Sequence, residues 1–372
     1  MKDTFLMIDG NSLLHRAFHA LPLMDAGGVY TNAIYGFLTM MLKAISDENA
    51  RYLAVCFDEH APTFRHTAYP DYKAGRAATP DELRQQFATI RTLLPEMGIQ
   101  VFSLQGWEAD DLLGTLSKLG EDSGVSPVIL TGDRDALQLV SDTTQVLFTR
   151  KGISETTHFT PAMVYEVYGF SPEQVVDWKG LAGDSSDNIP GVPGIGEKIA
   201  CKLVREWGTV ENILENVGKI PGKQGEKIAG WADNLRLAKR LTTICLDVPI
   251  PFREEYLTVC EPHIDELRGV FAELDFKAFM NDLANLAPPE ALPEGPRQEA
   301  QTQLAEMARA KSAAAKKAAL AGQGNLFGDP VVQMPEVREV PVAELQAEAD
   351  AMQLATAQNT PHEYTLVESA AQ

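Results

Sequence analysis

Acidic side chains stand where several predicted strands end. Asp9 closes the apolar run FLMID, Asp58 closes LAVCFD, and Asp133 follows PVILTG. Because ligands of an open α/β sheet bind at the carboxyl ends of its strands, we expect these acids to converge. Further acids stand close to one another in the motifs GWEADDLLG, TGDRDALQLV and AGDSSDNIPG, and these are Glu108, Asp110, Asp111, Asp135, Asp184 and Asp187.

A convergence of nine carboxylates calls for cations. Without counter-charges the acids would repel one another, and the pKa values of some would rise. Mg²⁺ prefers oxygen ligands, so an Asp and Glu cluster without His or Cys suits it. Two ions about 4 Å apart could stabilise the attacking and leaving oxygens of a phosphodiester. For any single pair of acids, helix capping or turn chemistry remains an alternative.

The segment 61–80 carries basic and aromatic residues and shows no clear period. A long segment without an apolar face is often a functional loop. Lys and Arg can meet phosphates, and Tyr can stack on a base of a single strand. A solvated loop is the alternative, but the position between a strand-end acid and the next helix favours function. The candidate residues are Arg65, Tyr69, Tyr72, Lys73 and Arg76.

The stretch GVPGIGEKIACKLV at 191–204 has the form of a hairpin between two helices. Gly194 and Gly196 allow a tight turn with exposed backbone N–H groups. Those groups and the following helix N-terminus would bind DNA phosphates, and Lys198 would add a charge. An ordinary turn between two helices is the alternative.

The elements that must position these residues follow from the hydrophobic pattern. Helical spacing covers 33–45 and 109–119. Strands that alternate with helices imply an α/β layer with a largely parallel central sheet. The predicted strands are residues 5–10, 53–58, 99–104, 127–132 and 144–148.

The pattern changes along the chain, which indicates more than one domain. We expect an α/β domain over 1–165 with an arch-like loop at about 61–80, and a helical domain over 166–286. The hairpin motif would lie at about 184–215. A rise in Pro, Ala, Gln and Glu predicts a linker over 287–330, with an Ala/Lys-rich helical stretch near 300–320. Residues 331–372 would begin a further domain that the chain does not complete.

Composition excludes several classes. The 372 residues are 45% hydrophobic and 23% charged, as in ordinary globular proteins. No apolar run could span a bilayer, and the N-terminus does not read as a secretory signal. The net charge of −20 argues against a general nucleic-acid binder, although local patches decide binding. No His spacing suits a metal. The scattered cysteines indicate free thiols in a reducing cytoplasm: Cys56, Cys201, Cys245 and Cys260.

With these motifs assembled, residues 1–285 resemble the 5′-nuclease (flap endonuclease) family. Within it they are most similar to the 5′→3′ exonuclease domains of bacterial DNA polymerases I. The motifs that carry the resemblance are MIDGNSLLHRAFHAL, GVYTNAIYGF, YPDYKAGR, WEADDLLG, TGDRDALQLV and GDSSDNIPGVPGIGEKIA. The resemblance implies a PIN-like α/β core and a helix-hairpin-helix (SAM-like) subdomain; we expect a mostly unstructured C-terminal tail.

The resemblance also assigns roles. It implies metal ligation by Asp9, Asp58, Glu108, Asp110, Asp111, Asp133, Asp135, Asp184 and Asp187. It implies catalytic roles for the loop basics Lys73 and Arg76. The expected DNA contacts are Arg16, Tyr72, Lys73, Arg76, Gly194, Gly196 and Lys198. The expected cofactors are two or more Mg²⁺ ions, replaceable by Mn²⁺, and a K⁺ ion at the hairpin turn.

The implied activity is structure-specific 5′→3′ exonuclease and 5′-flap endonuclease action on branched or nicked DNA. It would remove RNA primers in replication and act in excision repair, in the bacterial cytoplasm at the nucleoid. No polymerase activity is expected of this chain, so a polymerase would be a partner. A PIN-type ribonuclease and a catalytically silent DNA-binding scaffold are the alternatives. The hairpin and loop argue against the first, and the full set of acids against the second.

One motif of the tail suggests a protein partner. GQGNLFGDP, at 322–330, contains Gln323, Leu326 and Phe327, and it resembles the short peptide that binds the bacterial sliding clamp. Large apolar side chains gain free energy by leaving water, so an exposed Leu-Phe pair in a linker is unusual. The alternative is that the pair packs on the nuclease core or on a further domain.

Overall fold

The computed structural model describes residues 3–150 and 152–250, together with Phe271, Leu274 and Phe276. The expectations for the linker, for residues 331–372, for the clamp-like peptide and for Cys260 lie outside this part of the chain. No helix in the described ranges is long and apolar enough to span a membrane.

Six strands of the described residues form the central sheet, in the order β5-β4-β1-β6-β7-β8. All neighbours are parallel except β7 and β8, which are antiparallel. The five predicted strands are confirmed, and β8 is an addition that the sequence pattern did not indicate. The bounds are β1 (Thr4–Asp9), β4 (Ala50–Cys56), β5 (Gln100–Phe102), β6 (Ser126–Thr131), β7 (Gln145–Thr149) and β8 (Thr156–Phe159).

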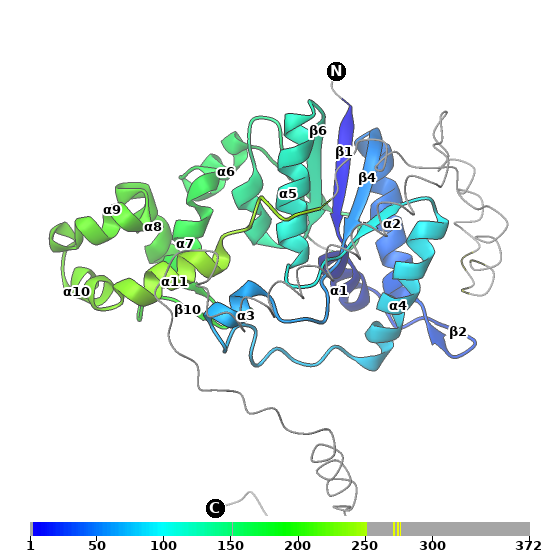
Figure 1. Cartoon of the computed structure of the whole chain (residues 1–372), viewed down its shortest axis with the longest axis horizontal. Coiled ribbons are helices and arrows are strands. Elements are labelled where there is room, and N and C mark those ends of the chain that lie inside the picture. Colours follow the sequence, from blue (N-terminus) through cyan, green and yellow to red (C-terminus); the bar gives the residue numbers. More distant parts are fainter. Residues whose placement is uncertain (1–2, 151, 251–270, 272–273, 275, 277–372) are drawn as a thin grey trace, which may run out of the picture. The chain divides into compact units, whose positions relative to one another are not determined.

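Both faces of this sheet are buried, as parallel sheets require. Along β1, Phe5 and Met7 enter one hydrophobic cluster, while Leu6 and Ile8 enter the other. Helix α5 (Ala109–Asp122) packs in the first cluster. Helices α1 (Gly10–Ala20), α2 (Asn32–Asp47) and α4 (Asp81–Glu96) pack in the second, across the sheet from α5 (Figure 1). The helices predicted over 33–45 and 109–119 are therefore confirmed.

Two irregular connections leave this layer. Between α1 and α2 lies a small hairpin of β2 (Asp25–Ala26) and β3 (Val29–Tyr30). Between β4 and α4 lies the predicted loop, which contains only the short helix α3 (Phe64–Ala68). The next helix begins at Asp81, so residues 69–80 lack regular structure.

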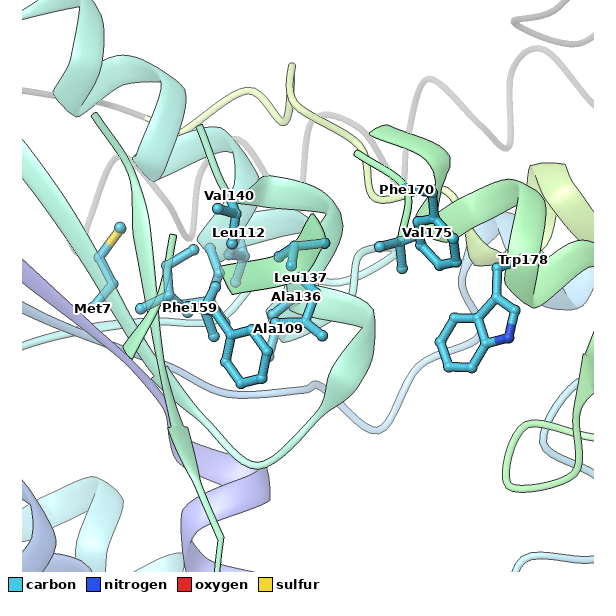
Figure 2. Packing of buried hydrophobic residues seen from close by; sticks show 14 of the residues in the cluster. Met7, Ala109, Leu112, Ala136, Leu137, Val140, Phe159, Phe170, Val175 and Trp178 are labelled. Atoms are coloured by element: carbon cyan, nitrogen blue, oxygen red, sulfur yellow. The ribbon is translucent and has the colours of Figure 1, made fainter. Parts of the chain in front are cut away.

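From Pro161 onward the described chain is mainly helical, as predicted. Figure 2 shows that one hydrophobic cluster runs from Met7 and Phe159 of the sheet, past Leu137, to Phe170 and Trp178 of the helical region. The two regions therefore share a core. In the α/β region, the 3₁₀ helix η1 (Arg134–Leu139) follows β6. The elements from Pro161 onward are α6 (Pro161–Tyr168), η2 (Pro172–Gln174), α7 (Val175–Ala182), β9 (Gly183–Asp184), β10 (Ile189–Pro190), α8 (Glu197–Trp207), α9 (Val210–Glu215), η3 (Val217–Lys219), α10 (Lys223–Gly230) and α11 (Ala232–Thr242).

Candidate active site

Three adjacent strands bring the strand-end acids to one edge of the sheet. β4, β1 and β6 are neighbours, and Asp58, Asp9 and Asp133 lie at or just past their carboxyl ends. Asp9 also caps α1: it accepts hydrogen bonds from Ser12 N (2.9 Å) and Thr131 Oγ1 (2.7 Å). These bonds fix the carboxylate at the helix N-terminus, where the macrodipole favours a negative charge.

The first turn of α5 reaches the same edge. The backbone N–H of Ala109 donates to Asp58 (2.7 Å), which ties this helix start to the end of β4. Asp110 is half-buried, and desolvation raises its pKa well above the ordinary value, with further contributions from the charges of Asp9, Asp133 and Asp58. Burial, with the charges of Asp58 and Asp133, likewise raises the pKa of Asp9 to about 7. Such mutual repulsion shows that these carboxylates converge.

A buried lysine neutralises the next two acids. Lys179 of α7 lies with its Nζ 2.5 Å from Asp135 Oδ1 and 2.5 Å from Asp184 Oδ2. The pKa of Asp184 falls below its ordinary value: burial would raise it, but Lys179 and the Ser186 hydrogen bonds outweigh burial. The pKa of Asp135 still rises to about 7, because burial and the charge of Asp133 together outweigh Lys179. In the sequence, Lys179 stands out only as the lone cation of the stretch VVDWKGLAG, and we did not predict its role.

The loop covers the last two acids. The Tyr72 hydroxyl lies 3.0 Å from Glu108 and 2.8 Å from Asp187 and has one proton to share between them, and Lys73 Nζ donates to Glu108 (2.8 Å). Arg76 pairs with Asp187. The Tyr72 ring is only 4% exposed, so in this structure it is not free to stack on a base. Tyr72, Lys73 and Arg76 are called the loop cap below.

Asp111, also expected as a metal ligand, is bound by protein groups. Its two oxygens accept a bidentate pair of hydrogen bonds from Arg65 (2.7 and 2.8 Å) and further bonds from the N–H groups of Glu108 (3.1 Å) and Cys245 (2.9 Å). Its exposed fraction is 0%. Its role here is structural: it closes a capping box with Glu108 at the start of α5. Both oxygens of Asp111 are thus already hydrogen-bonded, and a ligand role for Asp111 stays a prediction that is kept apart from the set named below.

Arg65 extends this junction to the helical region. Besides Asp111, it donates to the carbonyl oxygens of Leu241 (2.8 Å) and Thr243 (3.0 Å). Burial would lower the pKa of Arg65, but the Asp111 carboxylate raises it above its ordinary value. The base of the loop, α5 and the end of α11 are thus joined by one buried guanidinium.

The remaining acids suit a hard divalent cation. They are oxygen donors in buried surroundings, they repel one another, and protein cations stand between several of them. In the described residues, no three His, Cys, Asp or Glu side chains are already arranged around one ion position. We call the following set the acidic edge, and its ligand role stays a proposal: Asp9, Asp58, Glu108, Asp110, Asp133, Asp135, Asp184 and Asp187.

A cleft opens between this edge and α4. Its volume is about 660 Å³, and Asp58, Glu108, Lys73 and Arg76 are among the residues that line it. His15, which also lines it, packs edge-on against Phe87 and is not grouped with metal ligands. A chain with phosphate groups could reach the acids through this cleft.

The predicted hairpin lies at the start of α8. Val192 and Ile195 are buried and anchor it, while Gly194, Gly196 and Lys198 are exposed. Gly194 has a φ of +82°, which only glycine adopts without strain, and a Cβ there would lie 2.7 Å from Lys227 Nζ. Lys227 of α10 thus stands beside the turn, although the sequence places it 33 residues away.

Arg16 lies near the acidic edge rather than at the hairpin. Its Nη1 donates to the carbonyl oxygen of Arg150 (2.9 Å), and its Nε lies beside Gly132 at the end of β6. A DNA contact by Arg16 remains a prediction.

Comparison with known proteins identifies both regions. Residues 4–169 match the family described as 5′-3′ exonuclease, N-terminal resolvase-like domain. Residues 170–265 match 5′-3′ exonuclease, C-terminal SAM fold. The chain is 43% identical over 284 residues to DNA polymerase I of Bacillus subtilis, a match of 76% of this chain and 32% of that protein. It is 41% identical over 297 residues to the thermostable DNA polymerase I of Thermus thermophilus (79% and 35%).

Solved structures show the same fold at lower identity. A zinc-bound 5′-exonuclease of bacteriophage T5 is 23% identical, with a TM-score of 0.55 over 77% of this chain and 100% of that one. A bacteriophage T5 flap endonuclease, solved with DNA and metal ions, is 22% identical, with a TM-score of 0.52 over 76% and 98%.

The chain spans about a third of the length of the curated polymerases that it matches. The two domain matches nevertheless cover well over half of its residues, in the order and at the positions of the acidic edge and the hairpin. The chain therefore belongs to the 5′-3′ exonuclease family.

Proposed function

We propose that the chain is a Mg²⁺-dependent, structure-selective 5′ nuclease that hydrolyses phosphodiesters of DNA near a 5′ end. The observation that carries the proposal is the convergence of Asp58, Asp9 and Asp133 from three adjacent strands, with Asp110 of the first turn of α5 close enough to interact with all three. No structural need calls for so many repelling carboxylates at one edge. A DNA-binding scaffold would gain phosphate affinity by losing these acids.

The acidic edge would hold divalent cations. When bound, these ions would supply Lewis-acid stabilisation of the charge on the attacking and leaving oxygens. The chain itself contributes orientation: Ser12 and Thr131 fix Asp9, and Ala109 N fixes Asp58. Mn²⁺ is expected to substitute for Mg²⁺.

The loop cap would exchange its carboxylate partners for the substrate. Lys73 and Arg76 now pair with Glu108 and Asp187, and they line the cleft that leads to the acids. Ions bound at those acids would release both side chains toward a phosphate. Lys73→Ala and Arg76→Ala should therefore slow the single-turnover rate on a flap by about a hundredfold, a cost typical of lost positioning. An unchanged rate with weaker binding would reduce them to general electrostatics.

The helical hairpin would hold the duplex. Exposed N–H groups at Gly194 and Gly196, with Lys198, present a phosphate-binding turn. A K⁺ ion at this turn is part of the proposal. Two T5 structures that share the fold contain zinc, or DNA with metal ions, which supports both bound components without assigning residues here.

The cellular role is a further proposal. Relatedness to the polymerase I nuclease region supports RNA-primer removal and excision repair in the bacterial cytoplasm, with a polymerase as partner. Sliding-clamp binding through Gln323, Leu326 and Phe327 also remains a proposal. A peptide covering 318–332 should bind a purified bacterial clamp at micromolar concentrations, and replacing Leu326 and Phe327 by Ala should abolish this.

The deciding experiment is digestion of a 5′-labelled flap duplex in Mg²⁺, with single-stranded RNA of matched sequence as competitor. We expect cleavage near the flap junction, products with a 5′ phosphate, and full inhibition by EDTA. Preferential cleavage of the RNA would favour a PIN-type ribonuclease. Binding without cleavage in Mg²⁺ or Mn²⁺ would favour a scaffold.

A further inference from the structure

Lys179 occupies an unusual place for a charged side chain. It belongs to the short helix α7, where its neighbours Trp178 and Leu181 are buried in the core. Its side chain is 10% exposed, and its Nζ is held between Asp135 and Asp184 at 2.5 Å from each. Transfer of an ammonium into such surroundings is favourable only with this pairing.

Four other carboxylates of the acidic edge have no such cation. In the described residues, no Lys, Arg or His forms an ion pair with Asp9, Asp58, Asp110 or Asp133, whereas Asp135 and Asp184 share Lys179. The edge thus has an uncompensated part, formed by these four acids, and a second part, Asp135 and Asp184, that already contains one positive charge. The remaining two acids, Glu108 and Asp187, pair with the loop cap. A divalent ion would meet little competition in the first part and direct competition in the second.

We propose that Lys179 holds the place of one divalent ion, which binds between Asp135 and Asp184 only by displacing the ammonium. The inference rests on the proposed metal dependence. An ion at 2.0–2.1 Å from its oxygens cannot share two carboxylate oxygens with an ammonium already 2.5 Å from each. The flexible four-carbon stem allows Lys179 to move aside. Lys179 therefore makes this ion the weaker of two, and metal concentration controls the position of the lysine.

The first test measures ion binding without substrate. Mn²⁺ is titrated into the full metal-free chain and followed by electron paramagnetic resonance of free Mn²⁺. Wild type should bind one ion tightly and a second more weakly. Lys179→Met, which keeps the stem and removes the charge, should strengthen the weaker site by about tenfold, or 1.4 kcal/mol, and leave the tighter site within about twofold.

Lys239→Met is the matched control. Lys239 also bridges two carboxylates, Asp177 (2.6 Å) and Glu211 (2.7 Å), but these lie outside the acidic edge. This variant should bind both ions as wild type does. Equal Mn²⁺ affinities in wild type and Lys179→Met would overturn the inference, as would loss of the weaker ion in a Lys179→Met chain with wild-type far-ultraviolet circular dichroism.

The second test follows the lysine itself in the wild-type chain. Reductive methylation with mass spectrometry should find Lys179 protected in EDTA and modified as Mn²⁺ fills the weaker site, while the exposed Lys118 reacts equally throughout. If Lys179 stays unmethylated at saturating Mn²⁺, the ion does not displace its ammonium group. Lys179 would then affect the ion only through its charge at a distance, and the inference would be overturned. If two ions bind but Lys179 neither moves nor matters, this inference fails alone; if no Mn²⁺ binds, the proposed metal dependence fails with it.

Discussion

The acidic edge and the hairpin prepare for a phosphodiester in opposite ways. At the acidic edge, the ionised form of several carboxylates is disfavoured. Burial and neighbouring negative charges raise the pKa values of Asp9, Asp110 and Asp135. At the hairpin, Gly194, Gly196 and Lys198 are exposed, and an open turn presents backbone N–H groups.

This difference separates chemistry from binding. Preorganised charge in a buried site can stabilise a transition state, at a cost in folding free energy. An exposed turn with a nearby lysine binds phosphate through contacts that salt weakens. Variants of the acidic edge should therefore change cleavage, and variants of the hairpin should change affinity.

The largest expected effect is on cleavage by Asp133→Asn. Asp133 follows β6 and is exposed toward the edge, so neutralising it removes an expected ligand with little structural change. We expect cleavage in saturating Mg²⁺ to fall by about a thousandfold or more, while flap binding stays within a few fold. Asp142→Asn, at an exposed acid distant in sequence from the expected ligands, is the control. Near wild-type cleavage by Asp133→Asn would remove Asp133 from the ligand set.

A variant at the junction between the two regions should lower the free energy of unfolding. Arg65→Ala leaves Asp111 buried without its partner and removes donors from the carbonyl groups of Leu241 and Thr243. Breaking a buried pair in this way costs about 3–5 kcal/mol. Urea unfolding should show this loss, whereas Arg51→Ala, which removes a surface pair with Asp3, should cost less than about 1 kcal/mol. Equal losses in the two variants would refute the proposed role of Arg65.

Asp111 and Arg65 also show where sequence reasoning ends. Five of the six sheet strands and the helices α2 and α5 were predictable because hydrophobic periodicity is a local property. The capping alternative for Glu108 and Asp111 was visible in their spacing, but the partner of Asp111 lies 46 residues away in the loop. Lys179 was missed for a related reason: only the fold shows that α7 brings it between Asp135 and Asp184.

The surroundings of Tyr72 and Lys227 were also not predictable from the sequence. An aromatic residue in a loop suggested base stacking, yet Tyr72 is buried against two acids. The sequence separates Lys227 from the hairpin, yet α10 returns it to Gly194. Motif spacing thus predicted which residue types lie close together. Only the structure shows which of these residues form hydrogen bonds or ion pairs with one another.

A smaller effect is expected at the hairpin. Gly194→Val places a branched side chain at a φ of +82° and against Lys227 Nζ, so the turn should distort and duplex affinity should fall by about tenfold. Gly196→Ala is the matched control, because Gly196 has an ordinary φ of −91° and open space around its Cβ position. Fluorescence anisotropy at two salt concentrations measures both variants. Wild-type affinity for Gly194→Val would remove the turn from the DNA interface.

The smallest effect concerns pH and metal-free stability. The pKa values of Asp9 and Asp135 are raised to about 7, so their protonated forms are favoured in the folded state. Their contribution to stability is present at low pH and is lost as pH rises through about 7. His15, whose pKa burial lowers, opposes this trend below about pH 6.5.

In EDTA, the free energy of unfolding should therefore rise by at least about 1 kcal/mol between pH 8 and pH 6. Mg²⁺ should stabilise the chain more at pH 8, where the carboxylates are ionised, than at pH 6. Urea unfolding at both pH values measures this difference. A metal-free chain that is more stable at pH 8 would contradict the buried, repelling carboxylates.

The most direct test of the separation between chemistry and binding is single-turnover cleavage of a 5′ flap across a range of enzyme concentrations. At saturating enzyme, Gly194→Val should approach the wild-type rate, because only its affinity is impaired. Asp133→Asn should remain slower by about a thousandfold at every concentration. If excess enzyme restores cleavage by Asp133→Asn, or fails to restore it for a folded Gly194→Val, then the acidic edge and the hairpin do not divide the reaction in this way.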